Sequence, residues 1–303
     1  MNELFDFLIK KDVKYDINQP MSQYTSVRIG GCASVVAFPK TEDQLVDLVR
    51  FLVQEKREYR VVGRMTNILP CDSEYEGVLI STKLMDRYTC RGTMVVAECG
   101  VPVSSLILRC ARLNLGGLES LYAIPGSLGG MIVSNAGAYS AEIGDFVKSV
   151  RAYLPEVDRV QTIGREKLDF SYRSSVFLQK YMIIISAELE FCESSFEIIS
   201  DRLGKIRDKR SLSQPIDQPS LGSVFKKADG VSAGQIIDRC GLKGLRVGGA
   251  MVSTKHAGFI VNTGNATATD FRELIARIKR EVYRQCAILL EEEISFMHEI
   301  STK

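Results

Sequence analysis

The chain has 303 residues, of which 45% are hydrophobic and 25% are charged, and its formal net charge is +2. A chain of this length can bury a sizeable core and is expected to form two or three domains. The near balance of charge argues against a general nucleic-acid binder, and no apolar run approaches the roughly 18 residues of a membrane-spanning helix.

The first 192 residues alternate between predicted helices and short β-branched strands, which indicates a mixed α and β region. A short amphipathic helix opens the chain, and it lacks the apolar core and cleavage site of a signal peptide. Residues 41–55 begin with a Thr-x-x-Gln capping box, and a further helix begins at Pro102. The inward-facing residues of these two helices are predicted to be Leu45, Leu48, Val49, Leu52, Val103, Leu106, Ile107 and Cys110. Strands are expected at 59–62, 77–81, 94–99, 150–155, 159–163 and 182–191.

A charged and then proline-punctuated stretch at 193–218 predicts a helix that leads into a linker, so a domain boundary is placed there. Beyond it, a helix is expected at 232–240, a strand at 258–262 and a strand at 287–296. A strong helix from Thr269 places Phe271, Leu274, Ile275, Ile278 and Val282 on one face.

The eight cysteines are scattered, with no Cys-x-x-Cys pair, and the chain has only two histidines. Zinc sites and redox dithiols need close spacing, so we expect reduced, structural thiols in a cytosolic protein and no metal site.

Residues 123–140, "AIPGSLGGMIVSNAGAYS", carry four glycines and one proline but not one charged side chain. Glycines allow a ligand to approach the backbone closely, and successive N–H groups can form a cradle for an anion. Since one turn needs only four residues, we favour ligand binding over a simple turn. A G-x-G-x-x-G fingerprint is absent, which argues against a Rossmann domain.

Six segments occur in an order and at distances that resemble one known family. They are "YTSVRIGG" (24–31), "AIPGSLGGMIVSNAGAY" (123–139), "SYRSSVF" (171–177), "QPSLGSVFK" (218–226), "GLKGLRVGGAMVSTKHAGFIVN" (241–262) and "LEEEISF" (290–296). Together they resemble the UDP-N-acetylenolpyruvoylglucosamine reductase (MurB) family of peptidoglycan synthesis, over residues 24–296. The short interval from Arg173 to Ser223 resembles the family's shorter form, which lacks an inserted capping loop.

The resemblance implies an α+β fold: a two-lobed FAD-binding domain of the vanillyl-alcohol-oxidase (PCMH) type and a smaller α+β substrate domain. The first domain is expected at 1–192 with its lobes split near residue 70, and the second at 193–303, with the tail 288–303 returning toward the first lobe. It also implies FAD as cofactor and NADPH as reductant. The expected FAD contacts in the first of two loops are Ile124, Pro125, Gly126, Ser127, Gly129, Gly130, Asn135, Gly137 and Ala138.

The second expected FAD loop departs from the family pattern, a glycine run followed by Ser-Asn. Here it reads Gly63, Arg64, Met65, Thr66 and Asn67. A non-glycine residue at positive φ costs on the order of 1 kcal/mol. A charge-assisted contact from Arg64 to a phosphate would compensate.

The implied reaction reduces an enolpyruvyl ether to a lactyl ether, with hydride added at C3 and a proton at C2. By family position, Arg173 would hold the substrate carboxylate, Ser223 would give the proton to C2, and Glu293 would assist as an acid. Tyr172, Lys226, Lys243, His256 and Asn262 are secondary candidates for binding the nucleotide sugar.

Two alternatives remain open at this stage. The altered "GRMTN" loop allows a UDP-sugar-binding or regulatory homologue that has lost FAD. A flavin oxidase that tethers FAD covalently is less favoured, because no histidine lies in the first domain. The partners expected are the UDP-sugar and NADPH, with no nucleic acid and no membrane insertion, for a cytoplasmic monomer.

Overall fold

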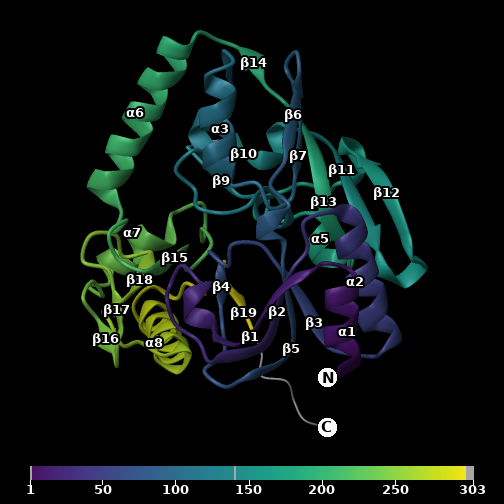
Figure 1. Cartoon of the computed structure of the whole chain (residues 1–303). Coiled ribbons are helices and arrows are strands. Elements are labelled where there is room, and N and C mark those ends of the chain that lie inside the picture. Colours follow the sequence, from purple (N-terminus) through teal and green to yellow (C-terminus); the bar gives the residue numbers. More distant parts are fainter. Residues whose placement is uncertain (1, 140, 298–303) are drawn as a thin grey trace. The chain divides into compact units, whose positions relative to one another are not determined.

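The computed structural model describes residues 2–139 and 141–297 (Figure 1). The described chain forms two compact units, each built from segments that are separate in the sequence. The first unit comprises residues 1–17, 35–64 and 77–208, and the second comprises residues 18–34, 65–76 and 209–303. Two internal segments, 18–34 and 65–76, therefore belong with the C-terminal part of the chain, although a linear boundary near 193–218 assigns them to the N-terminal domain.

The N-terminal part of the first unit has two amphipathic helices, α1 (Asn2–Lys10) and α2 (Glu42–Gln54). The accompanying four-stranded sheet has the order β1 (Lys14–Pro20), β2 (Cys32–Phe38), β5 (Tyr75–Ser81) and β3 (Tyr59–Val62). Strand β3 pairs with β5 in parallel. The predicted face of α2 is buried, and the Thr41 hydroxyl caps it by accepting from the Gln44 N–H at 3.2 Å. The capping box is incomplete, because the Gln44 side chain accepts instead from the N–H of Lys40.

The remainder of the first unit is built on a five-stranded antiparallel sheet. Its order is β12 (Arg159–Gly164), β11 (Val147–Leu154), β13 (Ile183–Glu190), β7 (Met94–Glu98) and β6 (Tyr88–Arg91). Helices α3 (Val103–Ala111), α4 (Leu128–Val133) and α5 (Val176–Gln179) belong to the same unit, as do the short pair β8 (Leu115–Gly116) and β14 (Cys192–Glu193). All four predicted inward residues of α3 are buried.

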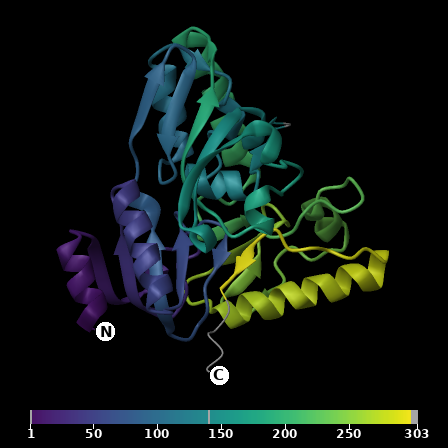
Figure 2. The same ribbon diagram turned by 90° about the vertical axis from the view of Figure 1, so that its right-hand side faces the viewer.

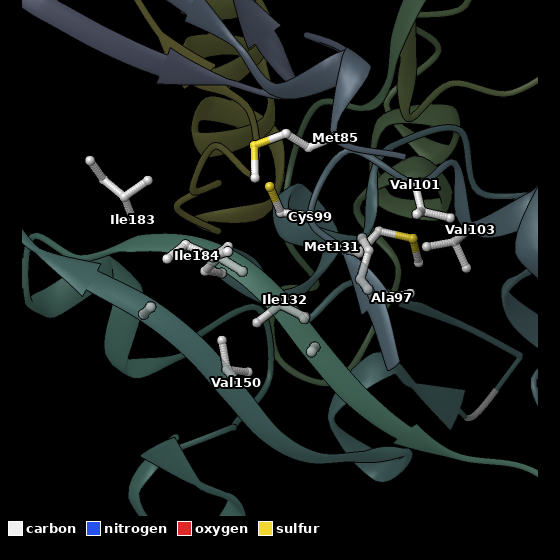
Figure 3. Close-up of a cluster of buried hydrophobic side chains, with 14 of the residues drawn as sticks. Met85, Ala97, Cys99, Val101, Val103, Met131, Ile132, Val150, Ile183 and Ile184 are labelled. Atoms are coloured by element: carbon white, nitrogen blue, oxygen red, sulfur yellow. The ribbon is translucent and has the colours of Figure 1, made fainter. Parts of the chain in front are cut away.

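Helix α4 anchors the glycine-rich segment 123–139 to this sheet. Figure 3 shows Met131 and Ile132 among the core side chains, with Val150 and Ile184 of the sheet near Ile132 and Ala97 near Met131. A ligand-binding loop is predicted here from the glycines and small residues, and two adjacent glycines each disfavour a helix by about 1 kcal/mol. A helix forms nevertheless, since Leu128, Met131 and Ile132 follow the helical period and are all buried.

The second unit is built on a four-stranded antiparallel sheet and one long helix. The sheet has the order β15 (Ser220–Ser223), β18 (Phe259–Asn262), β17 (Ala250–Val252) and β16 (Arg246–Val247). Helix α8 (Ala268–Cys286) packs its five predicted residues into the core, and α7 (Ala233–Arg239) matches the predicted helix after Ser232. Helix α6 (Phe196–Ser213), also predicted, contains the division between the units at residues 208 and 209.

The chain after α8 returns along the helix. Figure 2 shows α8 side-on in yellow-green and the yellow segment running back beside it to β19 (Ser295–Phe296). Strand β19 pairs in parallel with β4 (Ile68–Leu69). The strand predicted at 287–296 is thus wrong in extent: only Ser295–Phe296 is a strand, and an isolated bridge joins Phe225 to Glu292. Ala287, with a left-handed φ of 56°, ends α8, and Leu289 is 78% exposed, so the backbone hydrogen bonds of this segment begin only at Glu291.

We predict that Phe271→Ala lowers the free energy of unfolding by about 3–5 kcal/mol, because the Phe271 ring is fully buried beneath α8 and its removal leaves a cavity. Urea denaturation followed by circular dichroism measures this loss. Arg277→Ala on the exposed face of the same helix is the control, and an equally large loss there would contradict the prediction.

Candidate functional site

The start of α4 is fixed to the end of strand β7 by backbone hydrogen bonds. The N–H of Leu128 donates to the carbonyl of Val101 at 2.9 Å, and the N–H of Gly129 donates to the carbonyl of Cys99 at 2.8 Å. A Cβ atom on Gly129 would lie 3.0 Å from the Cys99 Cβ. Gly129 therefore lets α4 lie close to the sheet, and its contact with the cofactor stays a prediction.

Ser127, in contrast, presents an unused polar atom. Its side chain is 2% exposed, and its Oγ has no hydrogen-bond partner within residues 2–139 and 141–297. The hydroxyl lies beside the loop that follows β3: a Cβ on Gly63 would be 2.1 Å from it, and a Cβ on Gly130 would be 3.5 Å away. A buried hydroxyl without a partner costs about 1–3 kcal/mol, so this atom marks a place where a polar ligand group is expected.

The second expected loop shows the strain that its sequence predicts. Met65 adopts a φ of 47° and is buried, so the cost of a left-handed non-glycine residue falls on this position. Arg64 is exposed, and its charge helps to lower the pKa of Lys83, after the larger effect of burial. Thr66 is half-buried. The Asn67 amide donates to the carbonyl of Glu293 at 3.1 Å, so this side chain holds the C-terminal segment.

The Asn135 side chain makes three hydrogen bonds within the protein. Its amide Nδ2 donates to Glu142 Oε2 at 2.7 Å and to the Ser171 carbonyl at 2.9 Å, and its Oδ1 accepts from the N–H of Gly144 at 3.0 Å. The residue is 2% exposed and has a φ of 42°, a conformation that asparagine tolerates. These bonds occupy the polar atoms of the Asn135 side chain. Asn135 would therefore influence a ligand through the loops that it holds in place.

The other predicted cofactor contacts of this segment lie before α4 and in the strand that follows Asn135. Gly137 and Ala138 form β9, which pairs with β10 (Ala141–Glu142). A Cβ on Gly137 would lie 2.5 Å from the Ala141 carbonyl oxygen, so only glycine fits there. Pro125 is exposed, and Gly126, which is half-buried, has a φ of 153°. Ile124 is partly buried against the core of the first unit.

Arg173 lies in a tight turn in the same unit. The N–H groups of Ser171 and Ser174 each donate to the other's carbonyl, at 3.1 and 3.0 Å, and Arg173 between them has a φ of 53°. Its Nη2 donates to the Gly137 carbonyl at 3.0 Å, and its Nη1 lies 3.7 Å from Glu142 Oε1. Its Cζ is 5.0 Å from the centroid of the Tyr172 ring, which is itself 42% exposed. The guanidinium is therefore held in position while 16% of the side chain remains exposed.

Ser223 and Glu293 come together in the second unit, although 70 positions separate them in the sequence. Ser223 is the exposed last residue of β15, and it precedes Val224, whose carbonyl accepts the N–H of Glu293 at 2.8 Å. The same pairing continues as the N–H of Lys226 donates to the Glu291 carbonyl at 2.9 Å. Thus the C-terminal segment is fixed against the strand end that carries Ser223.

The two other glutamates of this run have cationic partners. Glu291 forms an ion pair with Lys226, and both carboxylate oxygens of Glu292 accept from Lys279 of α8, at 2.8 and 2.9 Å. Lys226, expected to contact the nucleotide sugar, is thus already paired with a carboxylate. Glu293 is half-buried and held through its backbone at both its N–H and its carbonyl.

Three secondary candidates have clear structural partners. The Asn262 amide is 6% exposed; it donates to the Val27 carbonyl at 3.0 Å and accepts from the N–H groups of Gly264 and Ala266. Lys243 forms a 2.7 Å ion pair with Asp238. Burial lowers the pKa of His256, whose Nδ1 accepts from the N–H of Gly258 at 3.1 Å. These bonds account for the positions of the three side chains, and a contact of each with the nucleotide sugar stays a prediction.

Sequence reasoning missed Glu142. It lies just past the uncharged segment, and its importance arises from folding, which places it against both Asn135 and Arg173. In the sequence, Glu142 stands out only as the first charged residue after the uncharged segment 123–140.

Within the described ranges, no group of three or more histidine, cysteine or acidic side chains is arranged to hold a metal ion. No helix among the described residues is long and apolar enough to span a membrane. The eight cysteines are free thiols in the structure, and burial raises the pKa of Cys99 to about 12.

Comparison with known proteins gives a consistent result along the chain. Residues 33–162 match the model of an FAD binding domain, and residues 214–297 match that of the UDP-N-acetylenolpyruvoylglucosamine reductase C-terminal domain. A UDP-N-acetylenolpyruvoylglucosamine reductase of Caldanaerobacter subterraneus subsp. tengcongensis is 38% identical over 96% of each chain. That of Clostridioides difficile is 37% identical over 98% of this chain and 97% of its own.

Among solved structures, the MurB of Thermus caldophilus superposes with a TM-score of 0.80 at 31% identity, covering 94% of this chain and 99% of that one. The predicted fold class is confirmed: an FAD-binding domain of the PCMH type is combined with a MurB C-terminal domain. With relatives this similar over nearly its whole length, the chain belongs to the UDP-N-acetylenolpyruvoylglucosamine reductase (MurB) family.

Proposed function

We propose that this chain reduces UDP-N-acetylglucosamine enolpyruvate to UDP-N-acetylmuramate in peptidoglycan precursor synthesis, with FAD as cofactor and NADPH as reductant. The observation that carries the proposal is the similarity to reductases of this substrate over 96% of the chain. We assign FAD binding to the first unit, which holds most of the residues matched by the FAD domain model, and proton donation to the second. We further propose that the enzyme is a cytoplasmic monomer.

The residues around Ser127 fit a bound flavin nucleotide. The buried hydroxyl lacks a partner among the residues described, while the glycines at 63 and 130 leave the space around it free of Cβ atoms. Both features suit a ligand with many polar atoms that lies close to the backbone. Gly129 and Asn135 are already used in packing and internal hydrogen bonds, so we propose that Gly126, Gly137 and Ala138 contribute to the cofactor site through their backbones.

FAD, when bound, would accept a hydride from NADPH and supply it to C3 of the enolpyruvyl group. Arg173 is suited to hold the substrate carboxylate, because a planar guanidinium can bind both carboxylate oxygens. Its own orientation is already set by the Gly137 carbonyl and by Glu142. The positive charge of the Arg173 guanidinium would stabilise the negative charge that develops on the enolpyruvyl carboxylate when hydride is added.

Ser223 is suited to give a proton to C2. Its hydroxyl is exposed at the end of β15, where it can reach a ligand. A serine hydroxyl is a weak acid, but a carbanion-like centre is a strong base, so transfer is favourable. Glu293, fixed next to Val224 by its N–H, would act as a neutral acid that stabilises the charge developing on the substrate.

The visible absorption spectrum tests the function directly. The purified chain supplemented with FAD should be yellow, lose its flavin absorbance with NADPH, and regain it when the enolpyruvyl nucleotide is added without oxygen. A chain that binds the UDP-sugar in calorimetry and remains colourless would instead support the homologue that has lost FAD. Reoxidation by oxygen alone, with no response to the nucleotide, would support an oxidase.

We predict that Ser223→Ala slows anaerobic reoxidation of the reduced flavin by the enolpyruvyl nucleotide about 10³-fold, because the proton donor at C2 is lost. Reduction by NADPH should be unchanged, and stopped-flow absorbance measures both half-reactions. Ser220→Ala, on the same strand, serves as the control. Equal reoxidation rates in Ser223→Ala and the parent would remove Ser223 from this role.

We predict that Ser127→Ala has opposite effects on the apo chain and on FAD binding. The apo chain should become more stable by about 1 kcal/mol, since a buried hydroxyl without a partner is removed. FAD affinity should fall about tenfold, since a hydrogen bond to the cofactor is lost. Thermal denaturation of the FAD-stripped chain and fluorescence titration with FAD measure the two effects.

Ser134→Ala is the matched control for this pair of measurements, because the Ser134 hydroxyl already bonds to the Gly130 carbonyl at 3.2 Å. It should not stabilise the apo chain. If Ser127→Ala binds FAD as tightly as the parent, the Ser127 hydroxyl does not contact the cofactor.

A further inference from the structure

Glu142 connects the glycine-rich segment to the arginine proposed to hold the substrate carboxylate. Its Oε2 accepts from the Asn135 amide at 2.7 Å, and its Oε1 lies 3.7 Å from Arg173 Nη1. The Glu142 side chain is 32% exposed and that of Arg173 is 16% exposed, so the pair is only partly screened by solvent. At 3.7 Å the contact is an ion pair rather than a short hydrogen bond.

The backbone of Glu142 is fixed independently of this ion pair. Its strand β10 pairs with β9, where Glu142 lies opposite Gly137. Its N–H donates to Asp145 Oδ2 at 2.8 Å as part of a capping box on the following turn. The Gly137 carbonyl opposite is the acceptor for Arg173 Nη2, so two adjacent points of one small hairpin contact the same guanidinium.

Asn135 sets the distance between this hairpin and the turn that carries Arg173. The same Nδ2 atom donates to Glu142 on one side and to the Ser171 carbonyl on the other. An amide NH₂ has two hydrogens, which match these two acceptors. Because Ser171 closes the turn around Arg173, the amide ties the carboxylate and the arginine backbone to one buried point.

We propose that Glu142, aligned by Asn135, is a positioning residue that orients the Arg173 guanidinium for the substrate carboxylate. This inference rests on the proposed function, because it assumes that Arg173 binds that carboxylate. A guanidinium on a flexible stem loses rotamer freedom when it binds, and contacts made beforehand reduce this loss. Glu142 and the Gly137 carbonyl provide those contacts on one side of the group.

The test compares two nucleotides that differ in the lactyl carboxylate. Calorimetry on the FAD-loaded chain measures the affinity for the product UDP-N-acetylmuramate, which carries this carboxylate, and for UDP-N-acetylglucosamine, which lacks it. Glu142→Gln should weaken binding of the first about tenfold and leave binding of the second within about twofold, because only the first engages Arg173. The substituted amide must turn an NH₂ toward either Asn135 or Arg173, both of which are donors.

Repeating the measurement in an Arg173→Ala background separates positioning from a general structural effect. If Glu142 acts through Arg173, Glu142→Gln should cause no further loss of UDP-N-acetylmuramate affinity there. Glu156→Gln removes an equal charge from an exposed position of the same unit and is the matched control. Should Glu142→Gln fail to fold, Glu142→Ala gives the same comparison without placing an NH₂ against Asn135.

Two results would overturn the inference: an equal loss of affinity for both nucleotides, or a loss that persists in the Arg173→Ala background. Unchanged affinity for UDP-N-acetylmuramate in Glu142→Gln would overturn it as well. Failure of the proposed function looks different, because the parent chain itself would then show no preference for the nucleotide that carries the carboxylate.

Discussion

The burial of three apolar side chains beneath the glycine-rich segment is the interaction on which the rest of the candidate site depends. Leu128, Met131 and Ile132 pack into the core of the first unit, and each buried side chain of this size contributes about 1.5–3 kcal/mol. A segment of small residues has little core of its own, and its loops would otherwise sample many conformations. With α4 anchored, Ser127 at its start and Asn135 just past its end have fixed positions.

Each unit uses one buried asparagine to hold its loops. Asn135 connects the hairpin, the Arg173 turn and the turn at Gly144 in the first unit. Asn262 connects Val27 to the loop before α8 in the second. Asparagine suits this task because its amide offers two donors and one acceptor in a rigid plane, so that one side chain can satisfy several backbone groups. Both residues were predicted to contact ligands, and the structure shows that both hold the segments around them.

Glu293 lies next to the strand end that carries Ser223 because the C-terminal segment returns to that strand. The N–H of Glu293 binds the Val224 carbonyl, and the Asn67 amide binds the Glu293 carbonyl, so this residue is fixed from both sides. Glu292, which precedes this glutamate, has an ion pair with Lys279 of α8, which ties the segment to the longest described helix of the unit.

The sequence by itself determined the helices with strong apolar periods, the core faces of α2, α3 and α8, and, through six short motifs, the family and its cofactor. These features are local, because the spacing of apolar residues and the residue types of a motif can be read without knowing what lies opposite. Tertiary structure alone decided that α4 forms despite two glycines, that residues 18–34 and 65–76 join the second unit, and that Gly129, Asn135 and Asn262 serve packing and hydrogen bonding. It also revealed Glu142 beside Arg173. The physical reason is that a side chain's role depends on which distant groups satisfy its hydrogen bonds and fill its surroundings, and the order of residues along the chain does not contain that information.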